Sequence, residues 1–345
     1  MLDDGLFNGD LSPLRELRSR ELITHLPWKT LENLRVVHFK HCCYSYGTTQ
    51  ILDFFESAPL LDTILLEYLM PYSSDTPPER TVHLDHLKPL TLAIAPSHPI
   101  LLYHLHIPIG ASLISQYRFD GEESPFLDFL PERSPNFSNL SHVTAINLFL
   151  GSQLVCVRLN GPSGSLRLLA GCSNTTSFLY FRDSRILGSF GSPILSKIQR
   201  LAVSGHKRPI PSKAEELLFS RMLSSANDLR TLILINYENL HFTHALDPEQ
   251  NPSNLALCCN MEELVLYFQY WTPHRVKPLI RMAENRASRG AKLSSITLVD
   301  LHGDGLREGV LELEEHFAHV EYRVGGATPG WDDVPGESDG SEKYR

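Results

Sequence analysis

A six-residue phrase of the form Leu-x-x-Leu-x-Leu, with related apolar residues at its three fixed places, recurs at a near-constant interval in this chain. Its clearest copies begin at Leu229, Met261 and Leu293, and their starts are 32 residues apart. A repeat of roughly 20–50 residues is typical of chains that stack one small structural unit per copy, so that each unit buries its apolar side against its neighbours. The interval therefore favours an elongated repeat fold over a core with a single centre.

The phrase itself predicts a short parallel strand in each copy, followed by a helical return crossing, as in leucine-rich-repeat solenoids. Further copies begin at Leu31, Leu61, Ile198 and Phe317, the last only 24 residues after Leu293. We predict an α/β fold, namely a leucine-rich-repeat-like curved solenoid with a parallel sheet on one face and helices on the other. Strands of regular units should pair in order, and they are expected at Leu34, Ile64, Leu201, Leu232, Leu264, Ile296 and Val320.

The repeat is irregular in the middle of the chain, at about residues 84–195, where extra β-strands are expected. The apolar runs 154–159 and 166–169 flank a Gly-rich segment, which predicts a β-hairpin. The repeat is regular again at about residues 196–324, so that we assign residues 1–324 to one solenoid. Gly, Pro, Asp, Ser and Glu dominate residues 325–345, a composition that indicates a disordered acidic tail.

Three helices are predicted from apolar periodicity and from residues that favour helix ends. They span Thr48–Ser57, Pro211–Ala226 and Val276–Ser288. Pro211 suits the first turn of its helix, and Gly290 suits the C-cap position after the third helix.

The charge and the cysteines restrict the partners and the compartment. The net charge of −9 disfavours nucleic acid as a partner, because a phosphate backbone attracts basic surfaces. Prolines interrupt the most hydrophobic region and no signal peptide is visible, so we expect no membrane association. The six cysteines lack a zinc spacing and read as reduced thiols. We therefore expect an intracellular monomer, cytoplasmic or nuclear.

Histidines are the main candidates for metal chemistry, and they form three close pairs, His83 with His86, His104 with His106, and His241 with His244. Only the first pair has another possible ligand beside it, Asp85. Because a usable metal site needs three or four ligands, structural or surface histidines are favoured. We predict no metal and no cofactor.

A nucleophile beside its base could be proposed at His41-Cys42-Cys43. Adjacent residues seldom bring such side chains together, and catalytic Cys and His are usually distant in sequence. We therefore expect a protein that is not an enzyme, with a metal- or Cys-dependent hydrolase as a remote alternative. Under this interpretation, alanine at His41, Cys43, His104 or His241 should leave partner binding intact.

The alternation within the phrase predicts a binding surface. The three leucine-type positions should point into the core, so the residues between and after them should lie on the opposite, concave face. In three consecutive units these are mostly apolar, namely Ile233, Ile235, Val265, Tyr267, Thr297 and Val299. We expect this patch to bind a protein around Tyr267, because aromatic residues are favoured at interface centres. Alternatively, residues 236–253 or the acidic tail cover the face and make these residues core.

Several phrases of the chain carry a family resemblance. They are Ile107–Leu113, Ala245–Pro248, Asn285–Leu298, His319–Arg323 and Trp331-Asp332. With these phrases, the chain resembles the F-box-associated, leucine-rich-repeat-like proteins of mushroom-forming (basidiomycete) fungi. The resemblance spans nearly the whole chain, and the phrases are structural rather than catalytic.

The resemblance implies a protein–protein interaction module that selects substrates for a cullin-type ubiquitin ligase. Such proteins dock on the ligase through an N-terminal F-box that begins near a Leu-Pro pair and ends in a Trp. Neither Leu26-Pro27 nor Leu130-Pro131 has that context, so an F-box would have to be supplied elsewhere. The alternatives are a degenerate paralogue and a free-standing scaffold without a ligase link.

Overall fold

A computed structural model describes most of the chain, and its described residues fall into two compact units. The described residues are 11–20, 31–41, 43–44, 48–67, 70–71, 80–94, 101–102, 104–119, 137–150, 154–172, 195–204, 219–220, 222–236, 242–250, 257–303 and 309–325. The first unit comprises Met1–Ile146 and Ser152–Ile194, and the second comprises Asn147–Gly151 and Leu195–Arg345. The strand β10 (Ala145–Leu150) is divided between them.

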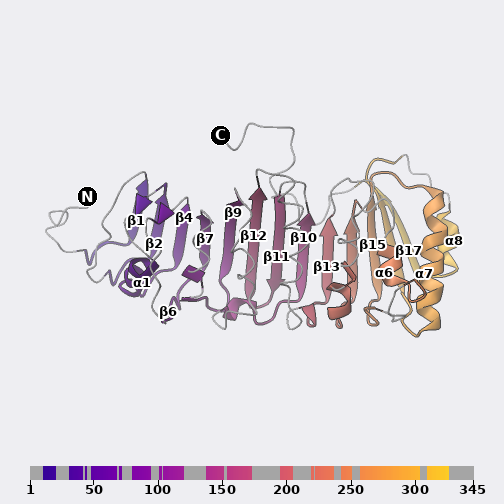
Figure 1. The fold of residues 1–345 in the computed structure, drawn as a ribbon, viewed down its shortest axis with the longest axis horizontal. Coiled ribbons are helices and arrows are strands. Elements are labelled where there is room, and N and C mark those ends of the chain that lie inside the picture. The colour runs from indigo at the N-terminus through magenta and orange to yellow at the C-terminus, as the bar shows by residue number, and fades with distance from the viewer. Residues whose placement is uncertain are drawn as a thin grey trace. The chain divides into compact units, whose positions relative to one another are not determined.

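The first unit is dominated by one sheet whose strands run side by side (Figure 1). Their order in the sheet is β1 (Glu16–Arg20), β2 (Val36–Lys40), β4 (Thr63–Glu67), β7 (Pro89–Ile94), β9 (Ser112–Phe119), β12 (Gly164–Cys172) and β11 (Leu154–Gly161). All neighbours from β1 to β12 are parallel. Two small parallel pairs accompany this sheet, β3 (Cys43–Tyr44) with β5 (Met70–Pro71) and β6 (Val82–His83) with β8 (Leu105–His106).

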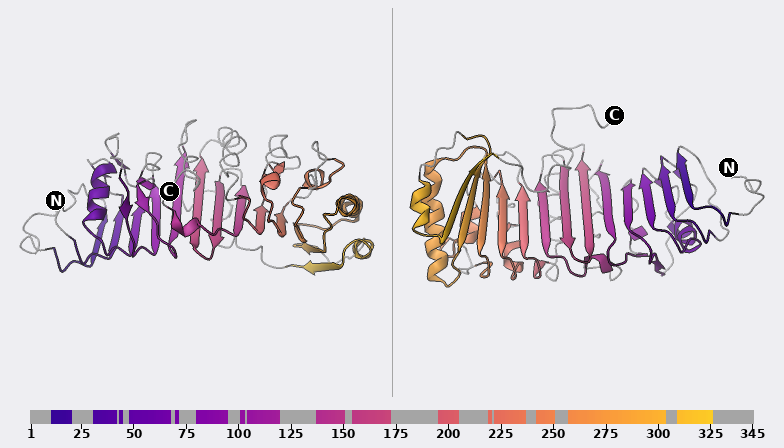
Figure 2. Two further views of the ribbon diagram at one scale, coloured as in Figure 1. Left: turned by 90° about the horizontal axis from the view of Figure 1, so that it is seen from below. Right: turned by 180° about the vertical axis from the view of Figure 1, so that it is seen from behind.

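The core of the first unit follows from strand alternation. Side chains at register partners share one face, and the row Leu17, Val37, Ile64, Leu90 and Leu113 is buried throughout. The helix α1 (Thr48–Glu56) covers this face (Figure 2). Its Phe54 ring lies 5.8 Å, centroid to centroid, from Phe39 of β2. The predicted helix at Thr48–Ser57 is therefore confirmed.

The predicted hairpin is also confirmed. The strands β11 and β12 are antiparallel, and β12 is in turn parallel to β9. Two glycines at the turn are required by close contacts, because a Cβ at Gly161 would overlap the carbonyl oxygen of His142, and a Cβ at Gly164 would overlap that of Ala111. Gly164 also has φ +138°, a conformation that L side chains rarely adopt. A short 3₁₀ helix, η4 (Ser138–Leu140), packs beside this hairpin.

The second unit contains a parallel sheet in chain order. Its strands are β13 (Arg200–Ser204), β14 (Thr231–Ile235), β15 (Glu263–Phe268), β16 (Ser295–Asp300) and β17 (His319–Val324). The register aligns the fourth place of every copy of the phrase, namely Leu201, Leu232, Leu264, Ile296 and Val320. The predicted strands and their pairing in order are thus confirmed in this unit, as is the neighbouring pair at Leu34 and Ile64 in the first.

Helices and turns connect the strands of the second unit. They are α6 (Phe242–Leu246), η6 (Pro273–Arg275), α7 (Val276–Ser288) and α8 (Val310–Glu314). The bounds predicted for α7 are confirmed. Gly290 has φ +77°, and the amide of Ala291 donates to the carbonyl of Arg286 at 3.0 Å, as expected of a glycine C-cap.

The described residues therefore form a mixed α/β protein with a large, mostly parallel sheet and few helices. Of the helix predicted at Pro211–Ala226, residues 219–220 and 222–225 are helical and the rest lies outside the described residues. The tail predicted at 325–345 lies outside them too, apart from Gly325. Among the described helices, none combines the length and the apolar character needed to cross a membrane.

Candidate functional site

The six residues predicted to bind a protein lie together in two adjacent rows on one face of β14, β15 and β16. The register aligns Ile233, Val265 and Thr297 in the first row and Ile235, Tyr267 and Val299 in the second. On the edge strand β17, the first row continues to Glu321 and the second to Arg323. The sheet thus brings the predicted residues onto a common face, as alternation requires.

Five of these six side chains are buried. Their exposed fractions are 5% for Ile233, 1% for Ile235, 9% for Val265, 6% for Thr297 and 2% for Val299. Ile233, Ile235 and Val265 form a buried cluster with Ala202, against which the partly buried Tyr267 packs. The expected exposed apolar patch is therefore not present at these five positions, which match the alternative of core residues. A binding role for Tyr267 stays a prediction.

The sequence contains a signal for this burial. The strand β14 reads Thr-Leu-Ile-Leu-Ile and is apolar at four successive positions, 232 to 235, all of them buried. A strand of a parallel sheet covered on both faces typically has a continuous apolar run, whereas a half-exposed strand alternates. The face with Ile233 and Ile235 should accordingly have been assigned to the interior.

Charged groups surround Tyr267 on this face. Burial raises the pKa of the Tyr267 phenol, and the nearby charges of Arg323 and Arg200 oppose the rise. Glu263 stands two residues before it on β15 and accepts a hydrogen bond from the Thr231 hydroxyl at 3.0 Å. Arg323 in turn pairs with Glu321 at 2.5 Å, and this hydrogen bond lowers the pKa of the Glu321 carboxyl. Tyr267 is therefore an aromatic group on an apolar base with a charged rim.

Two phrases that carry the family resemblance meet in the structure. Asn285 of α7 donates a hydrogen bond to the carboxylate of Asp247 at 2.9 Å. The neighbouring Arg286 is fully buried and donates to the carbonyls of Leu257 at 2.7 Å, Cys258 at 2.9 Å and Leu246 at 3.4 Å. Burial lowers the pKa of the Arg286 guanidinium. These residues thus hold two loops against α7, which is a structural role rather than a catalytic one.

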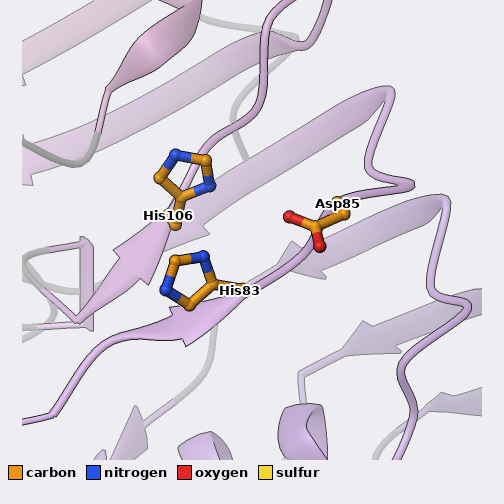
Figure 3. Close-up of side chains that lie close together, drawn as sticks. All are labelled: His83, Asp85 and His106. Carbon is orange, nitrogen blue, oxygen red and sulfur yellow. The ribbon is translucent and has the colours of Figure 1, made fainter.

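The histidines are arranged differently from their sequence pairs. His83, Asp85 and His106 gather at one place, and their potential ligand atoms all lie within 4.8 Å of one another (Figure 3). His104 is instead engaged through Nδ1, 2.9 Å from the carbonyl oxygen of Arg80. His86 lies in the exposed turn beside Asp85 and is not part of this group. The sequence reasoning missed His106 as a partner of His83, because the two residues meet only through the pairing of β6 with β8.

The remaining candidates do not form a described site. His41 is exposed with φ +52°, while Cys42 and the side chain of Cys43 lie outside the described residues. His244 is exposed on α6, and its predicted partner His241 lies outside the described residues as well. The described part of the chain therefore offers two places with functional potential, the surroundings of Tyr267 and the group of His83, Asp85 and His106.

Comparisons with known proteins add no assignment to either place. No protein-family model matches the chain, and no curated protein matches it in sequence.

Proposed function

We propose that this chain is a non-enzymatic protein–protein interaction module, built as a leucine-rich-repeat-like curved solenoid, with Tyr267 in its binding surface. The solenoid is supported by the parallel, in-order pairing of strands whose starting phrases lie 31 or 32 residues apart. The observation that carries the binding role is the arrangement at Tyr267, where one accessible aromatic group stands on a buried apolar cluster within a charged rim.

This arrangement resembles the centre of a protein interface in composition. Interfaces combine an apolar, well-packed centre with a polar rim, and their most important residues are enriched in Tyr, Trp and Arg. A ring that is already packed on one side loses little conformational entropy when a partner covers its other side. Arg200, Glu263 and Arg323 carry both signs of charge, so they would select the partner by charge complementarity.

The substitution Tyr267→Asp tests the proposal. We expect it to weaken partner binding about thirtyfold or more, the loss of about 2 kcal/mol that defines an interface hot spot. The matched control is Tyr270→Asp, because Tyr270 is 59% exposed and follows the same strand. Partners recovered with the wild-type chain and identified by mass spectrometry would then be titrated against both variants.

The stability of the variants decides how a loss of binding is interpreted. Tyr267→Asp should leave the melting temperature nearly unchanged, and Arg323→Glu, at an exposed rim position, should weaken binding by a smaller factor without affecting folding. A large loss of stability in Tyr267→Asp, together with unchanged binding in Arg323→Glu, would show that this surface is core and not a binding site.

The family resemblance extends the proposal to the identity of the partner. A substrate-recognition role for a cullin-type ubiquitin ligase requires an F-box from outside the described repeat, and recovery of a cullin adaptor would support it. Recovery of other proteins alone, with binding that depends on Tyr267, would support a free-standing scaffold without a ligase link.

A further inference from the structure

The strands β6 and β8 place two imidazoles side by side. They are neighbouring parallel strands, and their register pairs Val82 with Leu105 and His83 with His106. Val82 and Leu105 are buried, so alternation turns both histidines to the opposite side. The two rings are stacked, with centroids 4.8 Å apart and an interplanar angle of 30°.

A carboxylate joins the two rings from the turn after β6. This turn is closed by a hydrogen bond from the amide of Leu87 to the carbonyl of Leu84 at 2.9 Å, and it holds Asp85 two residues after His83. In Figure 3, one nitrogen of each ring is turned toward the Asp85 carboxylate. Three potential ligands from two adjacent strands and one turn thus converge on a common space.

The hydrogen bonding of His106 leaves one ring nitrogen available. Its Nε2 lies 3.1 Å from the hydroxyl oxygen of Ser138, whereas Nδ1 is buried and has no hydrogen-bond partner within the described residues. If Nε2–H donates to Ser138, the neutral ring presents a lone pair at Nδ1 toward Asp85 and His83. Metal-ligating histidines commonly have such a second partner, which fixes the tautomer and orients the ring. A buried polar atom without a partner costs about 1–3 kcal/mol, and a bound cation would remove that cost.

We propose that His83, Asp85 and His106 bind one divalent first-row transition-metal ion, for which zinc is the test ion. Two imidazoles and one carboxylate suit this class of metal better than Ca²⁺ or Mg²⁺, which prefer oxygen ligands. Three protein ligands leave one tetrahedral position for water. The ligand atoms lie within 4.8 Å of one another, against about 3.4 Å in a tetrahedral site with metal–ligand bonds of about 2.1 Å, so small side-chain rotations complete the site.

The bound ion would link two neighbouring repeats outside the main sheet. The pair β6–β8 has only two residues in each strand, so a metal that bridges His83, Asp85 and His106 would add a cross-link where few backbone hydrogen bonds exist. Because the imidazoles must be neutral to bind, the affinity should fall as the pH decreases through the histidine range near 6.5.

A zinc titration of the chelator-treated full chain tests the proposal, with a chromophoric chelator as competitor at pH 7.5. We expect Asp85→Asn and His106→Ala to lose one equivalent of zinc or to weaken its binding at least about tenfold. His86→Ala is the matched control, since His86 is exposed in the same turn but outside the group, and it should bind as the wild type does. Zinc held by other histidines or cysteines is common to all four proteins, so only the difference between them counts.

A second measurement identifies the ligands independently of stoichiometry. Addition of zinc should shift the side-chain NMR resonances of His83 and His106 and leave those of His86 in place. If His106→Ala fails to fold, Asp85→Asn decides, because it changes one exposed turn residue. Equal zinc binding by the wild type, Asp85→Asn and His86→Ala would overturn the proposal and leave the three residues as a stacked histidine pair beside a carboxylate.

Discussion

The sheet of the second unit and the hairpin region of the first unit reach parallel pairing by different routes. From β13 to β17, each strand pairs with the next along the chain, and partner residues such as Leu232 and Leu264 are 32 residues apart. In the first unit, β9 pairs instead with β12, and the partners Leu113 and Leu166 are 53 residues apart. The strand β11 occupies the place beyond β12.

This difference shows what the interval of the phrase determines. A parallel neighbour requires a crossover of a dozen or more residues, and the repeat supplies one of constant length in the second unit. An antiparallel neighbour needs only a tight turn, so residues 161–164 suffice to connect β11 with β12. A hairpin can therefore be inserted into a repeat fold when its second strand takes the parallel place and its first strand pairs outside it.

The largest expected effect concerns Arg286, which connects loops to α7 in the regular region. Arg286→Leu would leave three buried carbonyl oxygens without their donor, and we expect a loss of about 4 kcal/mol in the free energy of unfolding. Urea denaturation followed by circular dichroism measures this loss. Arg289→Leu is the control, because Arg289 is exposed at the end of the same helix and its substitution should cost less than about 0.5 kcal/mol.

The regional character of this effect sharpens the comparison. In Arg286→Leu, hydrogen exchange should accelerate in β14 to β16 and stay unchanged in β11 and β12. Equal stability of the Arg286 and Arg289 variants would contradict the structural role assigned to the buried guanidinium.

The next effect concerns the turn of the hairpin. Gly161→Ala would place a methyl group against the carbonyl oxygen of His142, and we expect it to cost about 3 kcal/mol by overpacking. Gly290→Ala in the second unit is the matched control, because Gly290 has φ +77° but open space around it, so only about 1 kcal/mol of backbone strain is expected. Thermal denaturation of both variants gives the comparison. A smaller loss at Gly161 than at Gly290 would mean that the hairpin turn is not as tightly packed as described.

The smallest effect compares two buried thiols at alkaline pH. Burial raises the pKa of Cys258 from 9.0 to about 12, opposed by Arg286, whereas burial raises the pKa of Cys156 against two arginines, Arg167 and Arg158. The unfolded thiol ionises first, so the stability due to the neutral Cys258 thiol is complete at pH 7 and is lost as the pH rises from about 9 to 12. At pH 10 the loss should be about 1.4 kcal/mol.

Alanine variants separate these two contributions. Cys258→Ala should reduce the difference in unfolding free energy between pH 7 and pH 10 by that amount, and Cys156→Ala should reduce it less. Cys259 serves as the control, because its side chain is exposed next to Cys258. An identical pH dependence in the wild type and Cys258→Ala would exclude the proposed cause.

The fold could be predicted in large part because its main signals are local. The fixed places of the phrase are apolar at a constant interval, which indicated both the strands and their neighbours, as at Leu232 and Leu264. The helix α7 ends in residues with clear capping chemistry, and the hairpin contains a Gly-rich turn. Each of these features depends on residues close together in the sequence, where periodicity and turn chemistry act.

The functional groups were harder to predict because they depend on contacts between distant segments. His83 meets His106 only through the register of β6 and β8, and Arg286 meets Leu257 only through the packing of a loop on α7. The burial of Ile233 and Ile235 was indicated by the continuous apolar run in β14, but the alternation of the phrase favoured an open face. Tertiary coverage of a sheet is not encoded in the period of one strand.

Methyl–methyl NOEs in a chain with labelled Leu and Ile methyl groups test most directly the claim that the phrase and the hairpin set the strand order. Neighbouring strands lie about 4.8 Å apart, so NOEs should connect Leu232 with Leu264 and Leu264 with Ile296, but not Leu232 with Ile296. In the hairpin region, NOEs should connect Leu113 with Leu166 and Leu166 with Leu159, but not Leu113 with Leu159. A direct NOE between Leu232 and Ile296, or between Leu113 and Leu159, would contradict this strand order.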